Sequence, residues 1–574
     1  MSRLKITFHL LAALFTLWAS SPVTSGQTAP PNTNAPAADP LVVPTLNGVI
    51  VWPAATGVKH EGVPGISGVR VMGPDFLRSA KFEHALAPFL GRPLTMSGLG
   101  RLQQEIVLFC RRADRPVVDV IVPEQGMKEG VLQLIVIEGR LGQVTVRNLD
   151  RKWFSDRLVL QGFRPKPDEP ISGRELTESL DWLNRSPLFR NVGATFKPGA
   201  VGRTDAVLNV EDRLPLRAFA NYEDSGVAGV GEQRLSTGFT WANVWGLDHQ
   251  LGYAYLTDSE FRKLTAHSVS YTAPLPWRHT LTLSGSVSSV RPDLAGFVGF
   301  SQQGESSSIN ARYDIPLPRW LSWYKHELSF AFDYKASDST VEFGGEPIFD
   351  SPTDVIQGML AYRGTVEDLF GTGTFAAQWF HSPGGLTTHN ADSFYDSTRT
   401  GAKAEYDILR ISGERLTKLP FTADWRRLPA SDCYTWALRG TWQWTNERLL
   451  PGEQLGAGGY ATVRGYDERV TNGDTGWLIS NELRTPAFRL GSIAGGPDTT
   501  AYLQALVFHD FGFTEIVRPE TGEDPSASLS SIGAGLRFGI GRHVSLRLDY
   551  GLQLGDRIGT TGRDRGHIGL QVSF

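Results

Sequence analysis

The sequence predicts an all-β transmembrane barrel of about sixteen antiparallel strands, preceded by two small α+β domains with the order β-α-α-β-β. Three observations lead to this prediction. The chain of 574 residues begins with an export signal and has no later apolar run long enough for a membrane helix. Residues 65–212 carry two successive β-α-α-β-β patterns. Residues 213–574 alternate between apolar and polar side chains and lose helical periodicity.

Residues 1–26 have the pattern of a secretory signal peptide. Arg3 and Lys5 precede an apolar run that ends at Trp18. This run has roughly 13 residues, fewer than the ~20 that a membrane-spanning helix needs. Residues 27–64 read as a Pro-rich leader or linker that contains one extended apolar patch at 46–52. A helix is not expected there, because the segment holds Pro30, Pro31, Pro36, Pro40 and Pro44.

Two mixed α+β units follow, at residues 65–139 and 140–212. In the first, a stripe of Leu99, Leu102, Ile106, Val107 and Cys110 has helical spacing. The strands expected in the first unit are 68–71, 117–122 and 131–137, and its helices are 80–90 and 96–112. The strands expected in the second unit are 144–148, 192–196 and 206–210, and its helices are 152–160 and 173–183. The shared order indicates an internal structural repeat.

Residues 213–574 are expected to form the barrel. Leu281, Leu283 and Val287 alternate with Thr282 and Ser286, and similar segments recur to the end of the chain. Each segment spans roughly 9–12 residues, which is enough to cross a bilayer when tilted, whereas strands of soluble sheets average about 5–6. A soluble sandwich or solenoid is the alternative. Exposed aromatic girdles are expected from Trp241, Trp245, Trp277, Trp320, Trp323 and Trp477.

Composition excludes several classes of function. A net charge of −4 without a basic run argues against a nucleic-acid partner. Cys110 and Cys433 are too far apart in the sequence for a paired-cysteine zinc motif, and the 12 histidines show no metal-ligand spacing. No nucleophile elbow or paired-carboxylate arrangement is found. We therefore expect no enzyme, no cofactor and no metal site.

A long glycine-rich loop at 450–473 interrupts the strand pattern. It contains Arg464, and Asp510 lies on a later strand between apolar neighbours. An arginine at the tip of a loop that folds into a lumen needs a partner, and a carboxylate offers it two parallel hydrogen bonds. The alternative is a solvated loop arginine that never meets Asp510.

Two motifs carry a family resemblance. The loop holds Val463, Arg464, Gly465 and Tyr466, and the later strand holds Phe508, Asp510 and Gly512 in the pattern Phe-x-Asp-x-Gly. Together with the two β-α-α-β-β units, they resemble the two-partner secretion transporters (TpsB; ShlB/FhaC/HecB haemolysin secretion/activation type). These belong to the superfamily of outer-membrane translocases that bear POTRA domains. The resemblance covers nearly all of the chain that follows the signal peptide.

The resemblance implies a function and partners. The barrel would lie in the bacterial outer membrane, in contact with its lipid, with two POTRA domains in the periplasm. The POTRA domains would bind an unfolded exported cargo, a large β-helical adhesin or haemolysin, and the barrel would secrete it. Arg464 would lie at the tip of an inward loop and pair with Asp510. The terminal Phe574 resembles the signal read by the barrel-assembly machinery.

An outer-membrane assembly or insertase factor of the same superfamily is the alternative function. Such insertases usually carry more POTRA domains, so two units favour secretion. A passive solute porin is a weaker third possibility, because a porin needs no periplasmic arm of this size.

Overall fold

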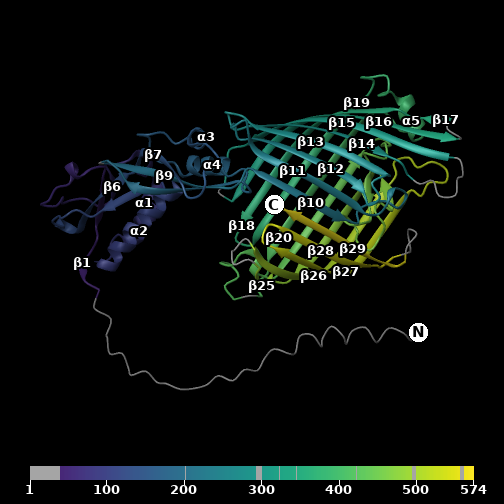
Figure 1. Cartoon of the computed structure of the whole chain (residues 1–574). Helices are drawn as coiled ribbons and strands as arrows, with labels where there is room; N and C mark the ends of the chain where they lie inside the picture. Colours follow the sequence, from purple (N-terminus) through teal and green to yellow (C-terminus); the bar gives the residue numbers. More distant parts are fainter. Residues whose placement is uncertain are drawn as a thin grey trace, which may run out of the picture. The chain divides into compact units, whose positions relative to one another are not determined.

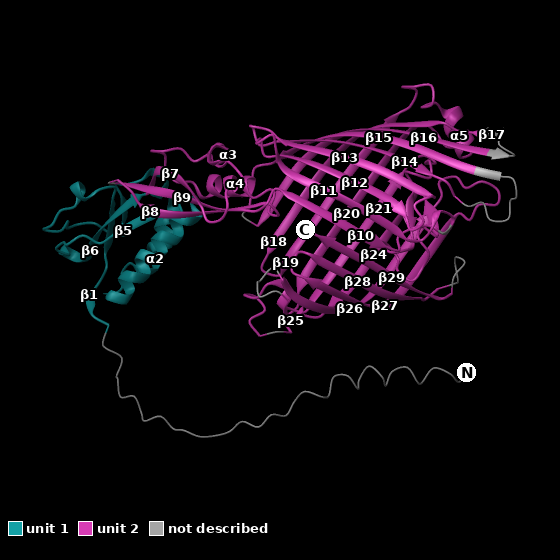
Figure 2. Ribbon diagram, viewed as in Figure 1, with its two compact units in different colours: residues 1–138 teal, residues 139–574 magenta. Residues whose placement is uncertain are grey.

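The computed structural model describes residues 39–200, 202–292, 300–321, 323–343, 346–421, 423–493, 499–555 and 562–574. The predicted signal peptide at 1–26 and the first part of the predicted leader, 27–38, lie outside these residues. The described chain divides into two compact units, residues 1–138 and 139–574 (Figure 2). Within the described residues, no helix is both long and apolar enough to cross a membrane.

The first unit is a small α+β domain with a four-stranded sheet in the order β3-β2-β6-β5. Its elements are β1 (Leu41–Val43), β2 (Gly48–Trp52), β3 (Gly68–Val71), α1 (Ala80–Leu86), β4 (Leu94–Thr95), α2 (Met96–Arg112), β5 (Val118–Ile121) and β6 (Val131–Glu138). Four residues of the predicted stripe on α2, Leu99, Leu102, Ile106 and Cys110, are buried in the core of this domain, whereas Val107 is half-buried. Helix α2 begins at Met96 because the side chain of Thr95 accepts a hydrogen bond from the backbone nitrogen of Gly98.

One strand of the first sheet comes from the predicted leader. Strand β2 falls within residues 27–64, yet it is a central strand, paired in parallel with β3 and with β6. Val49, Ile50 and Val51 are fully or almost fully buried. A parallel strand that is covered on both faces has a continuous apolar sequence with no alternation. Because turn-rich sequence follows β2, the strand was not recognised as part of the first β-α-α-β-β unit.

The second unit begins with the second β-α-α-β-β pattern. It comprises β7 (Arg140–Asn148), α3 (Asp156–Gly162), α4 (Gly173–Leu183), β8 (Arg190–Pro198) and β9 (Arg203–Asp212), with the sheet order β7-β9-β8. Helix α3 starts later than the predicted Lys152, because Ser155 caps it by accepting from the backbone nitrogen of Leu158. In this sheet the first strand, β7, pairs directly with the last strand, β9. In the first unit the corresponding strands β3 and β6 are separated by β2.

The rest of the second unit is a closed barrel of 16 antiparallel spanning strands, which run obliquely around it (Figure 1). They are β10 (Leu216–Glu223), β11 (Arg234–Val244), β12 (His249–Asp258), β13 (Leu264–Pro274), β14 (Thr280–Val290), β15 (Phe300–Pro316), β16 (Tyr324–Phe343), β18 (Thr353–Asp368), β19 (Gly371–Pro383), β20 (Glu405–Lys418), β21 (Thr435–Thr445), β24 (Thr475–Arg484), β26 (Thr500–Glu515), β27 (Ser526–Ile540), β28 (Val544–Gln553) and β29 (Asp564–Ser573). The short strands β17 (Glu346–Asp350) and β25 (Phe488–Ser492) extend two of the connections.

The barrel has an apolar outer face. Leu283, Val287, Phe332, Val507 and Leu548 are exposed, and polar side chains occupy the alternate, inward positions of the same strands. All six tryptophans predicted for aromatic girdles are also exposed, at Trp241, Trp245, Trp277, Trp320, Trp323 and Trp477. An outward apolar band with aromatic side chains is the surface that a bilayer-spanning barrel presents to lipid.

The barrel closes through a short seam between its first and last strands. Strands β10 and β29 share five residue pairs, from Phe219 opposite Ser573 to Glu223 opposite Gly569. Phe574 extends the seam, because its backbone nitrogen donates to the carbonyl of Ala218 at 3.0 Å. Closure leaves no free sheet edge in lipid, where an unpaired backbone group would cost several kcal/mol.

Candidate functional site

The connection between β21 and β24 folds back into the lumen. It includes the small hairpin of β22 (Leu455–Ala457) and β23 (Thr471–Gly473), and its tip is formed by residues 463–466. Val463 and Tyr466 are completely buried there. The tip contacts inward positions of β24, β26 and β28, which alternate with the exposed Leu483, Val507 and Leu548. This connection is called the inward loop below.

Arg464 and Asp510 form a two-pronged ion pair. The Nε atom of Arg464 donates to Oδ2 of Asp510 at 2.7 Å, and Nη2 donates to Oδ1 at 2.8 Å. The backbone nitrogen of Arg464 also donates to Oδ2, at 3.1 Å, and the hydroxyl of Ser480 donates to Oδ1 at 2.6 Å. Asp510 has no exposed surface and Arg464 is 2% exposed. The structure therefore brings together the two charged residues that the sequence analysis singled out.

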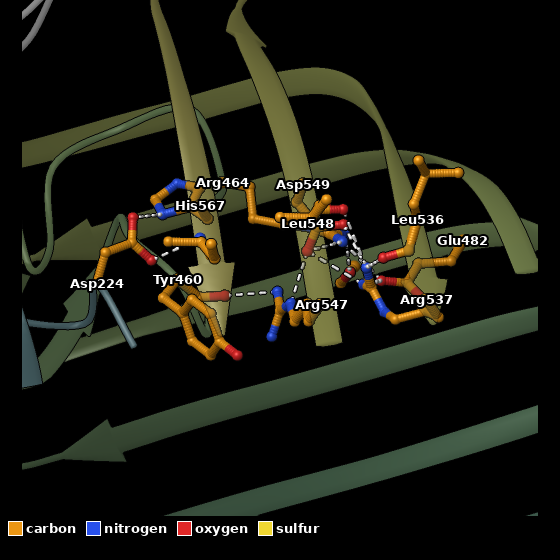
Figure 3. A network of polar contacts seen from close by, with 12 residues as sticks. Asp224, Tyr460, Arg464, Glu482, Leu536, Arg537, Arg547, Leu548, Asp549 and His567 are labelled. Atoms are coloured by element: carbon orange, nitrogen blue, oxygen red, sulfur yellow. Dashed lines mark hydrogen bonds and ion pairs between the residues drawn. The ribbon is translucent and has the colours of Figure 1, made fainter. Parts of the chain in front are cut away.

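Further charged side chains surround Arg464, among them Glu482, Arg537 and Asp549 (Figure 3). Nη1 of Arg464 donates to Glu482 at 2.7 Å and lies 3.5 Å from Asp549. Arg537 and Arg547 in turn bind Asp549, at 2.8 Å and 2.6 Å. Buried charges are stable only when they are paired and hydrogen-bonded, and removal of one partner from a buried pair costs about 3–5 kcal/mol. The network thus fixes the loop tip on the inner wall of the barrel.

The other residues of the two motifs shape the contact. The ring of Phe508 lies 3.5 Å from the guanidinium carbon of Arg464, in cation–π geometry. Gly512 leaves room for Val463, since a Cβ atom at Gly512 would come within 2.9 Å of Cγ2 of Val463. Gly465 has a φ of +90°, in the left-handed region that favours glycine. The hydroxyl of Tyr466 donates to the carbonyl of Ser530 at 3.0 Å.

Two residues of the last strand that were not found from the sequence also contact the inward loop. His567 Nε2 accepts from the backbone nitrogen of Gly465 at 3.2 Å, while its Nδ1 lies 3.3 Å from Asp224 (Figure 3). Arg565 binds Asp467 of the loop. Both residues alternate with the outward-facing Ile568 and Leu570, and this alternation in the sequence could have placed them on the inner face of the barrel.

The second α+β domain is fastened to three turns at one end of the barrel, which is called the domain-side end below. Arg185 and Arg190 both bind Asp248, which follows β11. Arg278, between β13 and β14, donates to the carbonyl of Gly162 at 2.8 Å and to Ser179 at 2.7 Å.

The third contact joins Arg319, between β15 and β16, to Asp181. Burial lowers the pKa of Arg278 to about 10 from 12.5, and burial also lowers the pKa of Arg185. Arg278 is buried at this contact, whereas Arg185 is half-buried.

Comparison with known proteins identifies the family. The family model described as haemolysin secretion/activation protein ShlB/FhaC/HecB matches residues 202–538, more than half of the chain. The chain belongs to this haemolysin secretion/activation family. A second model, the ShlB-type POTRA domain, matches residues 65–139.

Individual relatives agree with this assignment to the ShlB/FhaC/HecB family. The chain is 24% identical over 448 residues to the outer membrane transporter CdiB of Dickeya dadantii. The aligned region covers 73% of this chain and 74% of the relative. It is 22% identical over 513 residues to the heme/hemopexin transporter protein HuxB of Haemophilus influenzae strain 86-028NP, which covers 86% of this chain and 84% of the relative.

Solved structures of ShlB/FhaC/HecB-type relatives share the fold. CdiB from Escherichia coli superposes with a TM-score of 0.69 at 20% identity, covering 95% of this chain and 93% of that chain. CdiB from Acinetobacter baumannii superposes with a TM-score of 0.61 at 16% identity, covering 96% and 95%. The predicted fold class and the predicted family, an outer-membrane secretion protein with periplasmic POTRA domains, are confirmed. Family membership favours secretion over the insertase alternative.

Proposed function

We propose that this chain secretes one cognate exported protein, a large β-helical cargo of the adhesin or haemolysin class. The cargo is taken up unfolded on the periplasmic side, passes through the lumen and folds outside. Membership of the haemolysin secretion/activation family supports the class of cargo. In this transport no covalent bond is made or broken; the protein takes up the cargo, lets it pass and controls the lumen.

Uptake is assigned to free sheet edges and to a cavity at the domain-side end of the barrel. Strand β5 is an edge of the first sheet, and β8 is an edge of the second. An extended segment can add to such an edge through main-chain hydrogen bonds, with little demand on sequence. Next to α4, a cavity of about 930 Å³ opens between the second domain and the inner wall. Arg164, Lys325 and Arg439 line it.

A wall rich in hydroxyl groups supports a path for the cargo. Ser286 and Ser288 on β14 face Ser308 and Ser306 on β15, and each pair is hydrogen-bonded across the strands, at 2.8 Å and 2.7 Å. Val287 and Ile309, their alternates, point outward and are exposed. Neutral hydroxyls can exchange hydrogen bonds with a moving peptide backbone without holding it by charge. We assign this wall as a surface over which the cargo slides.

The Arg464 network carries the proposal for control of the lumen. A loop tip with a buried arginine held by Asp510 and Glu482 is fixed in place, and it occupies space inside the barrel. We assign Val463, Arg464, Gly465 and Tyr466, with Phe508, Asp510 and Gly512, as the lock that positions the inward loop for secretion. The apolar outer face is assigned to outer-membrane lipid, and Phe574 to recognition by the barrel-assembly machinery.

The test is the charge reversal Arg464→Glu, expressed together with the cognate cargo. It places a third carboxylate beside Asp510 and Glu482, so the loop tip should leave the wall and secretion should be lost. The variant barrel should still insert and remain heat-modifiable in detergent gels. Arg415→Glu is the control, because Arg415 pairs with Asp368 near the domain-side end of the barrel and, among the described residues, does not contact the inward loop's Arg464 network. Normal secretion by the Arg464→Glu variant would refute the assigned role of the lock.

A further inference from the structure

Asp474 is a buried carboxylate at the base of the inward loop, directly before β24. It has no exposed surface. Within its own loop it accepts hydrogen bonds from the backbone nitrogen of Leu449 at 3.1 Å and from Nε2 of Gln454 at 3.0 Å. It also accepts from the backbone nitrogen of Val517 at 2.9 Å and from both Nη atoms of Arg399, with Nη2 at 3.2 Å. A single side chain thus joins three connections: 384–404, 446–474 and 516–525.

A second ion pair joins two of these connections again. Arg448, which is 2% exposed, binds both carboxylate oxygens of Glu523, at 2.8 Å and 2.9 Å. Nη1 of Arg448 also donates to the carbonyl of Arg518 at 2.7 Å. Two-pronged arginine–carboxylate pairs fix direction as well as distance. The base of the inward loop is therefore held against the connection 516–525 at two separate points.

The connection 384–404 packs into the outer end of the lumen. It carries α5 (Asp392–Thr398), which lies at the end of the strands away from the second α+β domain (Figure 1). Tyr395 of α5 is completely buried in an apolar cluster with Leu449 and Leu450 of the inward loop. Met359 and Tyr406 complete the contact from the barrel wall. They occupy inward positions, because the alternates Leu360 and Ile411 are exposed.

We infer that Asp474 is a positioning residue that latches three outer connections together and keeps the outer end of the lumen closed when no cargo is passing. This inference deepens the proposed function, because a secretion pore must open there for its cargo. The latch is separate from the lock at the loop tip. Asp474 binds Arg399, Leu449, Gln454 and Val517, whereas Arg464 binds Asp510, Glu482 and Ser480.

The experiment measures ion conductance of the purified full-length protein in planar lipid bilayers, without cargo. Asp474→Asn keeps the size of the side chain but removes its charge, so the pair with Arg399 is lost. We expect a several-fold rise in mean conductance, together with more frequent open events. Asp474→Glu, which restores the carboxylate, should move the conductance back toward that of the unchanged protein.

Two further variants keep the inference falsifiable. Arg399→Gln breaks the same pair from the other side and should also raise the conductance; it decides the matter if Asp474→Asn fails to fold. Asp368→Asn is the matched control, because Asp368 forms an equally direct pair with Arg415 near the domain-side end of the barrel. Unchanged conductance in a folded Asp474→Asn or Arg399→Gln variant would overturn the latch. That result would leave the proposed secretion function standing, since conductance is measured without cargo.

Discussion

Gly465 at the tip of the inward loop and Gly551 on β28 lie backbone against backbone. A Cβ atom at Gly551 would come within 2.7 Å of the nitrogen of Gly465, and a Cβ atom at Gly465 would come within 2.9 Å of the carbonyl carbon of Gly551. Real Cβ atoms essentially never approach so closely, and here the obstacle is backbone that cannot rotate away. The loop tip can therefore sit on this wall only because both positions lack a side chain.

The first prediction concerns Gly551→Ala. The added methyl group should push the tip away from β28 and stretch the pair between Arg464 and Asp510, so secretion should fall sharply while the barrel still inserts. Trypsin digestion of the purified protein should show faster cleavage after Arg464, which is buried when the loop is docked. Gly358→Ala is the control, because a Cβ atom there meets nothing within 4 Å. Equal cleavage rates in the two variants would contradict the close contact.

A second prediction concerns the attachment of the second α+β domain to the barrel. Asp248→Asn removes the charge that Arg185 and Arg190 share, and the buried Arg190 and the half-buried Arg185 would then face one another without their carboxylate. We expect a broader distribution of distances between spin labels placed on the domain and on a turn at the domain-side end of the barrel. Asp168→Asn breaks an exposed pair with Arg203 inside the same domain and should leave the distribution narrow. A narrow distribution in the Asp248→Asn variant would show that the remaining contacts suffice.

A third prediction concerns pH and the outer ion pair. The hydrogen bond from Arg448 is the main cause that lowers the pKa of the Glu523 carboxyl from 4.5 to about 2, helped by the backbone nitrogen of Glu520 and the nearby charge of Arg399. A lowered carboxyl pKa contributes stability that is complete above the unfolded value and is lost as pH falls through the folded value. The ion pair between Arg448 and Glu523 should therefore be unaffected by pH above about pH 5 and weaken as pH falls from about 4.5 toward 2.

Conductance recorded over this range checks the third prediction. The unchanged protein should show a constant mean conductance at neutral and mildly acidic pH, with a rise in the acidic window. Glu523→Gln cannot titrate at this position, so it should already show the raised value at neutral pH. A rise in the unchanged protein near neutral pH would assign the transition to a different group.

Much of the fold could be predicted from local pattern alone. Whether a strand residue faces lipid or lumen follows from strict alternation, so Val287 and Ser286 could be assigned to opposite faces without coordinates. The helix at 173–183 is also predictable from the sequence, because Ser172 and Glu175 form an N-terminal capping pattern before the apolar stripe. Strand β2 could not be predicted as a central strand, because an apolar run of five residues followed by turns shows no periodicity.

The candidate site could be predicted only in part. Arg464 and Asp510 were found through their motifs, but Glu482, Asp549 and His567 were not, although each stands at an inward position of a recognisable strand. Asp474 was also missed. It lies between a turn and a strand, where a carboxylate is common, and nothing in its neighbourhood in the sequence reveals Arg399 or Val517 as partners.

The sequence by itself predicted an export signal, and it determined that the last two thirds of the chain form a barrel with an apolar exterior and that an arginine-tipped loop interrupts it. Only the tertiary structure decided which inward residues meet: Arg464 with Glu482 as well as Asp510, and Asp474 with Arg399. The physical reason is that facing in or out is set by each residue's own backbone, whereas opposition across a lumen depends on the register of every strand and on the closure of the whole sheet.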